Sequence, residues 1–149
     1  MRIDIKKINE NAITPTTGSK LAAGCDLYAC VNDNVVIPAG KTVLINTGIC
    51  MAIPEHFGGF IFPRSGLASK QGLRLANCVG VVDSDYRGEV KVALYNDSDE
   101  DRVVFNGDRV AQIVFLPFAT ADFVEVDQLD NTERGVGGFG STDTPKENA

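Results

Sequence analysis

Residues 80–88 read Gly-Val-Val-Asp-Ser-Asp-Tyr-Arg-Gly and place two carboxylates beside a tyrosine. Asp83 directly follows three apolar residues, so we expect it at the buried end of a strand, where a carboxylate can act as a general base on water. The pattern also predicts a β-hairpin with its turn around residues 84–88. Acidic residues are common at turns for conformational reasons alone. The segment by itself therefore leaves a catalytic and a purely structural interpretation open.

Residues 63–66, Pro-Arg-Ser-Gly, offer groups that suit a phosphate. Residues 65–72 predict a short helix, with Ser65 near its start and Gly72 at its end. The free N–H groups at the start of a helix and the guanidinium group of Arg64 both attract an anion. A turn with a solvated arginine would use the same residues, so this segment does not decide between the two.

Residues 135–140 match the dinucleotide pattern G-x-G-x-x-G in form only. That fingerprint requires a preceding strand, a following helix and a surrounding βαβ unit, and only nine residues follow Gly140, so we reject it. No Gly-Lys-Ser/Thr sequence occurs, which excludes a Walker A loop. Residues 134–142 carry groups that suit a nucleotide, because an aromatic ring can stack on a base and a cation and hydroxyls can bind phosphate. These groups belong to Phe139, Arg134, Ser141 and Thr142. A disordered tail in which these groups bind nothing is the alternative.

The elements that must position these segments are short strands. Apolar residues alternate with polar ones, or form short β-branched runs, and turn residues separate them at intervals of about ten residues. The expected strands are residues 3–8, 35–37, 43–49, 59–62, 90–94, 103–105, 109–118 and 123–126. This spacing predicts an all-β barrel or sandwich. From about residue 127 onward the chain has little apolar periodicity, which predicts a mobile tail.

Length and composition narrow the class of protein. The 149 residues fit one domain, and the 44% of hydrophobic residues suffices for a core. The 14 basic and 20 acidic residues give a net charge of −6, and no Lys/Arg cluster occurs, which argues against a nucleic-acid partner. No apolar stretch approaches the ~20 residues that span a bilayer, and the N-terminus does not resemble a signal peptide. We expect no membrane partner.

The cysteines and the single histidine indicate no metal site. The four cysteines form no C-x-x-C pair, and His56 has no potential metal-ligand partner nearby in the sequence. Reduced thiols that pack as small apolar groups are typical of an intracellular protein. We expect a cytoplasmic protein, or a nuclear one if its source is eukaryotic or viral.

Five segments, taken together and in order, resemble the five sequence motifs of the trimeric deoxyuridine triphosphatase (dUTPase) family. They are residues 23–28, 63–68, 80–88, 107–112 and 134–142. The resemblance implies an all-β, jelly-roll-like β-barrel over residues 1–126 with one short helix. It also implies a flexible, Gly-rich tail over residues 127–149 that closes over a site of a homotrimer. Each site would then draw residues from all three chains.

The activity that this resemblance implies is the hydrolysis of dUTP to dUMP and pyrophosphate by attack of water on the α-phosphate. Such a dUTP diphosphatase keeps uracil out of DNA and supplies dUMP for thymidylate synthesis. Mg²⁺ would be held mainly by the triphosphate, with Asp26 and Gln112 binding it through water. Two alternatives are the related dCTP deaminase and a non-catalytic nucleotide- or protein-binding regulator of the same fold.

The resemblance also implies roles for individual residues. Asp83 matches the base that activates water, and Tyr86 matches the ring that packs under the deoxyribose and excludes a 2′-hydroxyl. The uracil edge would be read by Asn77, by the backbone of Gly80, Val81 and Val82, and by the strand near Lys91. The phosphates would contact Arg64, Ser65 and Gly66, together with Arg134, Ser141 and Thr142 of the tail, and Gly140 would also bind the substrate. Phe139 would stack on the uracil.

Overall fold

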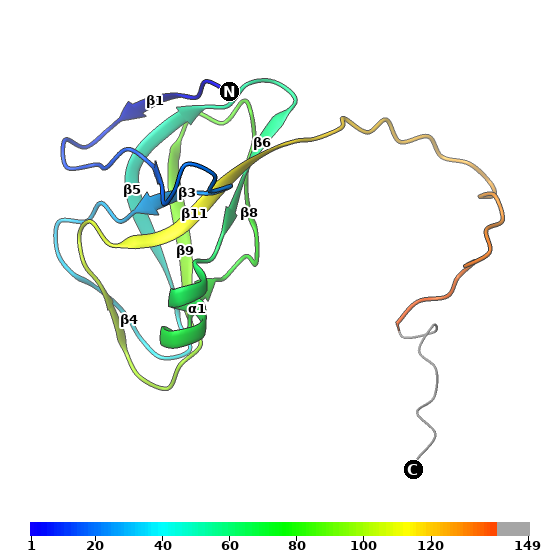
Figure 1. Cartoon of the computed structure of the whole chain (residues 1–149). Helices are drawn as coiled ribbons and strands as arrows, with labels where there is room; N and C mark the ends of the chain where they lie inside the picture. Colours follow the sequence, from blue (N-terminus) through cyan, green and yellow to red (C-terminus); the bar gives the residue numbers. More distant parts are fainter. Residues whose placement is uncertain (140–149) are drawn as a thin grey trace, which may run out of the picture.

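The computed structural model describes residues 1–139 and is built almost entirely from short strands (Figure 1). In chain order the elements are β1 (Asp4–Lys7), β2 (Thr16–Thr17), β3 (Cys25–Tyr28), β4 (Val35–Ile37), β5 (Thr42–Ala52), β6 (Phe57–Phe62), α1 (Ser65–Gln71), β7 (Leu73–Leu75), β8 (Gly80–Val82), β9 (Glu89–Asn96), β10 (Arg102–Val104) and β11 (Arg109–Pro117). Within residues 1–139, no helix is long and apolar enough to cross a membrane.

The strands form two main antiparallel sheets. One has the order β1-β5-β9-β7, the other has the order β2-β3-β11-β6-β8, and β10 pairs with β4 separately. Period-two alternation supplies the core: Val90, Val92 and Leu94 of β9 are buried, whereas Lys91 between them is exposed. The all-β, jelly-roll-like fold that the sequence predicted is confirmed.

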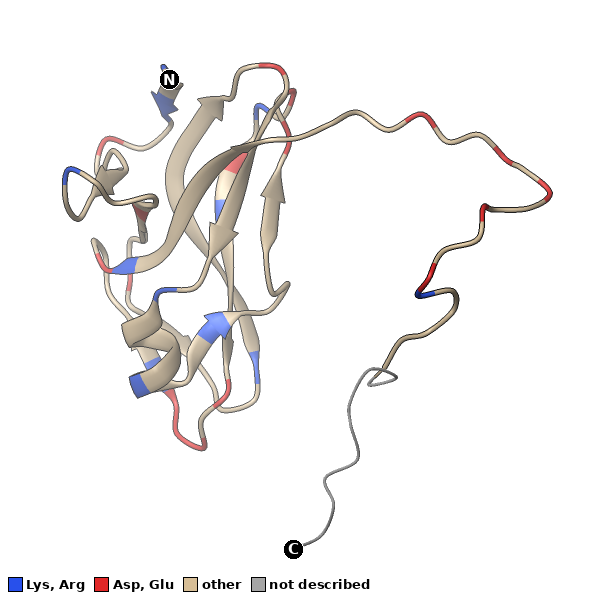
Figure 2. Ribbon diagram, turned by 45° about the vertical axis from the view of Figure 1, so that its right-hand side comes forward, with Lys and Arg blue, Asp and Glu red and all other residues tan. Residues whose placement is uncertain are grey.

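Most of the predicted strands are present, but one prediction is wrong. Residues 123–126 form no strand, and Phe123 is 94% exposed. In Figure 1 the chain after β11 runs away from the sheets, so this segment has no neighbouring strand with which to pair. Apolar alternation alone is not enough, because a strand also needs a partner for its backbone groups. Figure 2 shows acidic residues along the same segment.

The predicted hairpin over residues 80–88 is also wrong. β8 pairs with β6, whereas β9 pairs with β5 and β7, so the two strands lie in different sheets. Residues 83–88 therefore cross from one sheet to the other. The short connection between β8 and β9 would favour a hairpin. The chain crosses between the sheets instead, because this buries Val82 and Val90 on the inner faces of two facing sheets.

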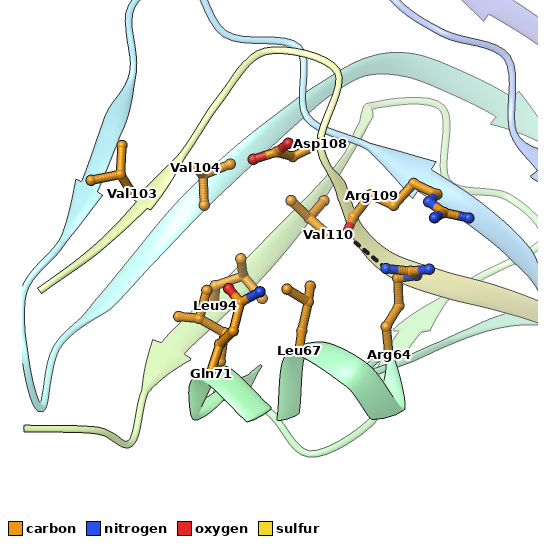
Figure 3. Close-up of a pocket in the computed structure, with 10 residues that line it drawn as sticks. Arg64, Leu67, Gln71, Leu94, Val103, Val104, Asp108, Arg109 and Val110 are labelled. Carbon is orange, nitrogen blue, oxygen red and sulfur yellow. Dashed lines mark hydrogen bonds between the residues drawn. The ribbon is translucent and has the colours of Figure 1, made fainter. Parts of the chain in front are cut away.

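Helix α1 begins and ends as the sequence predicted. Arg64, the residue before it, is extended with φ −88° and ψ 130°, and Gly72 ends it in the left-handed conformation with φ 67°. Arg102 donates from Nε to the Gln71 carbonyl at 2.9 Å, which fixes the last turn to β10. Figure 3 shows Leu67 facing a hollow of about 240 Å³ between α1 and β11. The helix therefore holds Arg64 in place at its start.

Candidate active site

A cleft of about 420 Å³ opens on the outer face of the five-stranded sheet, beside the start of α1. The cleft is lined by three residues that lie opposite one another on adjacent strands: Asp26 of β3, Gln112 of β11 and Phe62 of β6. Arg64, Ser65 and Gly66 also line this cleft. Two groups of residues that are far apart in the sequence, the predicted phosphate segment and the predicted metal positions, therefore share one cleft.

Asp26 is the electrostatic centre of this cleft. Its side chain is only 13% exposed, and its two oxygens accept hydrogen bonds from Arg64 Nε at 2.9 Å and from Arg109 Nη1 at 3.3 Å. A largely buried carboxylate needs such partners, and removing them would leave an unpaired charge. Two cations face one anion, so the cleft retains a net positive charge that suits a phosphate.

Arg109 is a site residue that sequence reasoning missed. Strict strand alternation places residues 109 and 112 on opposite faces of β11, and this pattern gave no reason to group Arg109 with Gln112. The pairing of β11 with β3 shifts register between Arg109 and Ala111, which is a β-bulge. The bulge accounts for both side chains lining the same cleft. Figure 3 shows Arg64 reaching the Arg109 carbonyl as well.

The start of α1 presents donors to the cleft. Ala68 is the first residue whose N–H bonds back along the chain, to the Arg64 carbonyl at 3.0 Å. The N–H groups of Ser65 and Gly66 therefore have no partner within the helix, as at every helix start. Both residues are exposed beside the Arg64 guanidinium group, so two backbone donors and a charged fork are available together to one anion.

Gly24 leaves the space that the side-chain amide of Gln112 occupies in this cleft. Gln112 donates from Nε2 to the Pro63 carbonyl at 3.0 Å, and a Cβ atom at Gly24 would lie 2.6 Å from Gln112 Oε1. The missing side chain at residue 24 therefore leaves the space that this oxygen occupies. Gln112 Oε1 and the Asp26 carboxylate supply oxygen atoms on neighbouring strands, which is the donor type that Mg²⁺ prefers.

A second pocket, of about 270 Å³, lies where the two sheets meet at β8 and β9. It brings together the residues before the tail that the sequence linked to uracil and deoxyribose: Asn77, Gly80, Val81, Val82, Tyr86 and Lys91. Among residues 1–139, β8 is the last strand of its sheet, so no neighbouring strand there uses the backbone groups on its outer edge. A planar heterocycle with hydrogen-bonding edges would fit such a strand edge.

Asp83 directly follows β8, as predicted, but it is exposed and not at a buried strand end. The reason is the alternation of β8, which buries Gly80 and Val82 and turns the next side chain outward. Asp83 lines a separate hollow together with Glu55 and Phe118. Its carbonyl accepts a hydrogen bond from the Tyr86 N–H at 3.2 Å, so its backbone is tied to a residue that lines the second pocket.

The loop that carries Asp83 and Tyr86 is held by its own side chains. Arg87 donates from Nη1 to the carbonyls of Ser84 at 2.7 Å and Tyr86 at 2.9 Å. Tyr86 donates its hydroxyl to the Glu89 carbonyl at 3.0 Å. Sequence reasoning missed this role of Arg87, because a single arginine at a turn usually points into solvent and makes no such contacts.

The cleft and the second pocket do not form one continuous site in a single chain. They share no lining residue, and neighbouring residues of β6 divide between them: Phe62 lines the cleft, whereas Ile61 lines the second pocket. Successive residues of a strand point to opposite faces of a sheet. Within one chain the two hollows therefore belong to opposite faces of β6.

Arg134 and Phe139, the predicted site residues in the described part of the tail, line neither hollow. Arg134 donates from Nε to the Gly137 carbonyl at 2.8 Å, and the Phe139 ring is fully exposed. Gly140, Ser141 and Thr142 lie outside the described residues.

Cys25 is the cysteine nearest to the cleft carboxylate. Burial and the neighbouring Asp26 charge both raise the pKa of its thiol, so it stays protonated at neutral pH. Among residues 1–139, no three His, Cys, Asp or Glu side chains gather as metal ligands. A metal at the cleft would therefore take its ligands largely from elsewhere, such as the phosphates of a substrate.

Comparison with known proteins identifies a family. The dUTPase family model matches residues 10–143. A deoxyuridine 5′-triphosphate nucleotidohydrolase of Desulfitobacterium hafniense is 55% identical over 122 residues, which is 81% of each chain. One from Hydrogenobaculum sp. is 45% identical over 142 residues, or 95% of this chain and 98% of that protein. A dUTPase structure from Staphylococcus bacteriophage 80alpha with dUpNHpp has a TM-score of 0.86 at 25% identity, covering 95% of this chain and 98% of that one.

Proposed function

The chain belongs to the dUTPase family, and on that premise we propose how its residues carry out the reaction. It hydrolyses dUTP to dUMP and pyrophosphate by attack of water on the α-phosphate, which keeps uracil out of DNA and supplies dUMP for thymidylate synthesis. The relatives carry the name of nucleotidohydrolases, so neither a dCTP deaminase nor a non-catalytic regulator is favoured. The residue roles proposed below rest mainly on one observation: the chain has two separate hollows, a cationic cleft that suits phosphates and a pocket at the free edge of β8 that suits a base.

Uracil is read, in this proposal, by the free edge of β8 and by Asn77. Fixed backbone N–H groups donate to carbonyl oxygens but cannot accept from an amino group, so cytosine would leave its 4-amino group unpaired. Gly80 supports this arrangement, because a Cβ atom there would lie 3.2 Å from Asn77 Nδ2. The amide of Asn77 can therefore approach the strand closely.

The triphosphate occupies the cleft of the five-stranded sheet. Arg64 and Arg109 face it as cations, and the N–H groups of Ser65 and Gly66 add neutral donors. Arg134, Gly140, Ser141 and Thr142 of the tail add contacts to the terminal phosphates. This arrangement stabilises the negative charge that develops on the phosphates as the bond to the α-phosphate breaks.

The cleft fits Mg²⁺ held through water. The Asp26 carboxylate already accepts hydrogen bonds from two guanidinium groups, and the Gln112 amide is held by its hydrogen bond to the Pro63 carbonyl. The carboxylate and the Gln112 Oε1 atom are therefore placed to accept hydrogen bonds from water and not to surround a bare ion. Mg²⁺ usually keeps several waters and binds substrate phosphates. Asp26 and Gln112 would hold those waters, and the ion would supply charge neutralisation at the triphosphate.

Asp83 is the general base in this proposal. A carboxylate that accepts a proton from water produces a stronger nucleophile toward the α-phosphate. The bond from the Tyr86 N–H to the Asp83 carbonyl holds the backbone of the base to the residue that packs under the deoxyribose. The position of the sugar therefore determines the position of the α-phosphate relative to the base.

The complete site requires several chains, and we propose a homotrimer. One chain supplies the pocket at β8 and β9, a second supplies the cleft, and a third supplies residues 127–149 as the closing segment. Two features support this. The hollows face opposite sides of β6, and the segment after β11 exposes apolar side chains that a neighbour would cover: Phe123 is 94%, Leu129 79% and Val124 75% exposed.

Pyrophosphate release from dUTP, dCTP, dTTP and UTP, measured side by side, tests the proposed selectivity. Rapid release from dUTP and slow release from dCTP agree with the strand-edge reading of uracil. Comparable release from dCTP would contradict it, since cytosine differs at the edge that β8 reads.

We expect the Tyr86→Ala variant to lose selection against ribose. The ring is 46% exposed and lines the pocket of β8 and β9, where it would pack against the deoxyribose and leave no room for a 2′-hydroxyl. The ratio of kcat/KM for dUTP to that for UTP should fall by roughly tenfold to a hundredfold, the range of discrimination that pocket shape supplies. An unchanged ratio would remove this role from Tyr86.

A further inference from the structure

We propose that Gly88 is a positioning residue that determines sugar selectivity. Its missing side chain sets where the Tyr86 ring lies, and the ring in turn sets how strongly a ribose is excluded. The inference rests on the sugar-packing role proposed above for Tyr86.

The ring of Tyr86 occupies the space that a side chain at residue 88 would take. A Cβ atom at Gly88 would overlap the Tyr86 hydroxyl oxygen and would lie 2.6 Å from Cζ and 3.0 Å from Cε2. Such distances are far inside van der Waals contact, so either the ring or the backbone would have to move. The three nearest atoms all belong to the Tyr86 side chain. A methyl group at residue 88 would therefore displace the ring.

The backbone of Gly88 does not itself demand glycine. The glycines with positive φ among residues 1–139 are Gly40, Gly48, Gly72, Gly107 and Gly135, and Gly88 is not one of them. The φ angle at residue 88 therefore gives no reason for a glycine there. The presence of glycine at residue 88 is instead explained by the space that it leaves for the Tyr86 ring.

The far end of the ring is fixed as well. The Tyr86 hydroxyl donates to the Glu89 carbonyl at 3.0 Å. Glu89 is itself held, because its Oε1 accepts from the Gly48 N–H at 2.8 Å and its Oε2 lies 3.6 Å from Lys91 Nζ. The Glu89 side chain is only 15% exposed. The hydroxyl and the Cζ carbon are the atoms that a Cβ at Gly88 would strike, so a displaced ring would also lose its hydrogen bond to Glu89.

The experiment combines Gly88→Ala, Tyr86→Ala and the double variant, with kcat/KM measured for dUTP and UTP. We expect Gly88→Ala to lower the dUTP/UTP ratio by at least about tenfold, while the melting temperature and trimer stay near those of the wild type. In the double variant, Gly88→Ala should add no further loss, because the ring that it displaces is already absent. A crystal structure of Gly88→Ala should show the Tyr86 hydroxyl away from the Glu89 carbonyl.

Gly58→Ala is the matched control. A Cβ atom there would lie 3.1 Å from Cε2 of Phe60, so it also crowds an aromatic ring two residues away, but outside both hollows. Its dUTP/UTP ratio should stay unchanged. If Tyr86→Ala lowers the ratio and Gly88→Ala does not, the inference about Gly88 is wrong and the role of Tyr86 stands. If Tyr86→Ala leaves the ratio unchanged, the proposed role of Tyr86 is wrong, and the inference about Gly88 fails with it.

Discussion

The Asp83→Asn variant is expected to turn over dUTP about 10²- to 10⁴-fold more slowly than the wild type, the usual contribution of a general base. Asparagine keeps the size of the side chain and one hydrogen-bond acceptor but cannot take a proton from water. Asp83 is exposed and outside the core, so the fold should not change. The affinity for dUTP should stay close to that of the wild type, because Asp83 lies outside the two hollows that we propose bind uracil and phosphate.

Asp85→Asn is the matched control for Asp83. Asp85 is an exposed carboxylate in the same loop and lines the same hollow, but its charge has no role in the proposed reaction. We expect single-turnover rates near those of the wild type for Asp85→Asn and greatly reduced rates for Asp83→Asn. Near-normal turnover by Asp83→Asn would mean that the water is activated by another group.

Removing residues 132–149 is expected to lower turnover by about 10³-fold while leaving the melting temperature and the proposed trimer nearly unchanged. The expected loss has two sources. Stacking of Phe139 on uracil is worth roughly 1–3 kcal/mol by analogy with single-strand binders. The Arg134 contact to the terminal phosphates acts most strongly in the transition state, so kcat should fall more than affinity. Within the described part of this segment, neither side chain packs on the core, which explains the small effect on stability.

Phe139→Ala separates these contributions. It removes the ring but keeps Arg134 and the closing segment, so its loss of turnover should be smaller than that of the truncation. Calorimetry on both variants checks stability, and steady-state kinetics checks turnover and KM. A large fall in the melting temperature on truncation would show that residues 132–149 support the fold and do not act mainly on the substrate.

The fold was predictable from the sequence because its core strands carry a strong period of two. β9 was identified from alternating apolar residues, β11 from an apolar run, and α1 from Ser65 and Gly72. β2, β3 and β7 were missed: β2 has only two residues, and β3 and β7 lack the β-branched run that marked β4 and β10, which are no longer. Pairing was not predictable either: β8 and β9 look like a hairpin locally, and only the packing of two sheets separates them.

The structure brings some of the predicted site residues together and leaves others apart. Asp26 lies opposite Gln112 and shares the cleft with Arg64, Ser65 and Gly66, whereas Arg134 and Phe139 line neither hollow. Arg109 was missed because a β-bulge, which has no clear sequence signal, turns it to the cleft. The exposure of Asp83 was missed because three apolar residues before it suggested burial, whereas alternation along β8 decides the direction of its side chain. The division between two faces of β6 depends on tertiary structure alone.

Mixing Asp83→Asn subunits with subunits that lack residues 132–149 tests most directly whether the sites are shared between chains. Each parent alone has a defect in every site, but a mixed trimer can combine the base of a truncated chain with the tail of an Asp83→Asn chain. Random one-to-one assembly should restore about a quarter of the wild-type sites. Native mass spectrometry verifies that mixed trimers form, and pyrophosphate release from dUTP measures the activity. Activity near a quarter of the wild-type value is the predicted result. Verified mixed trimers with no more activity than the average of the two parents would contradict shared sites.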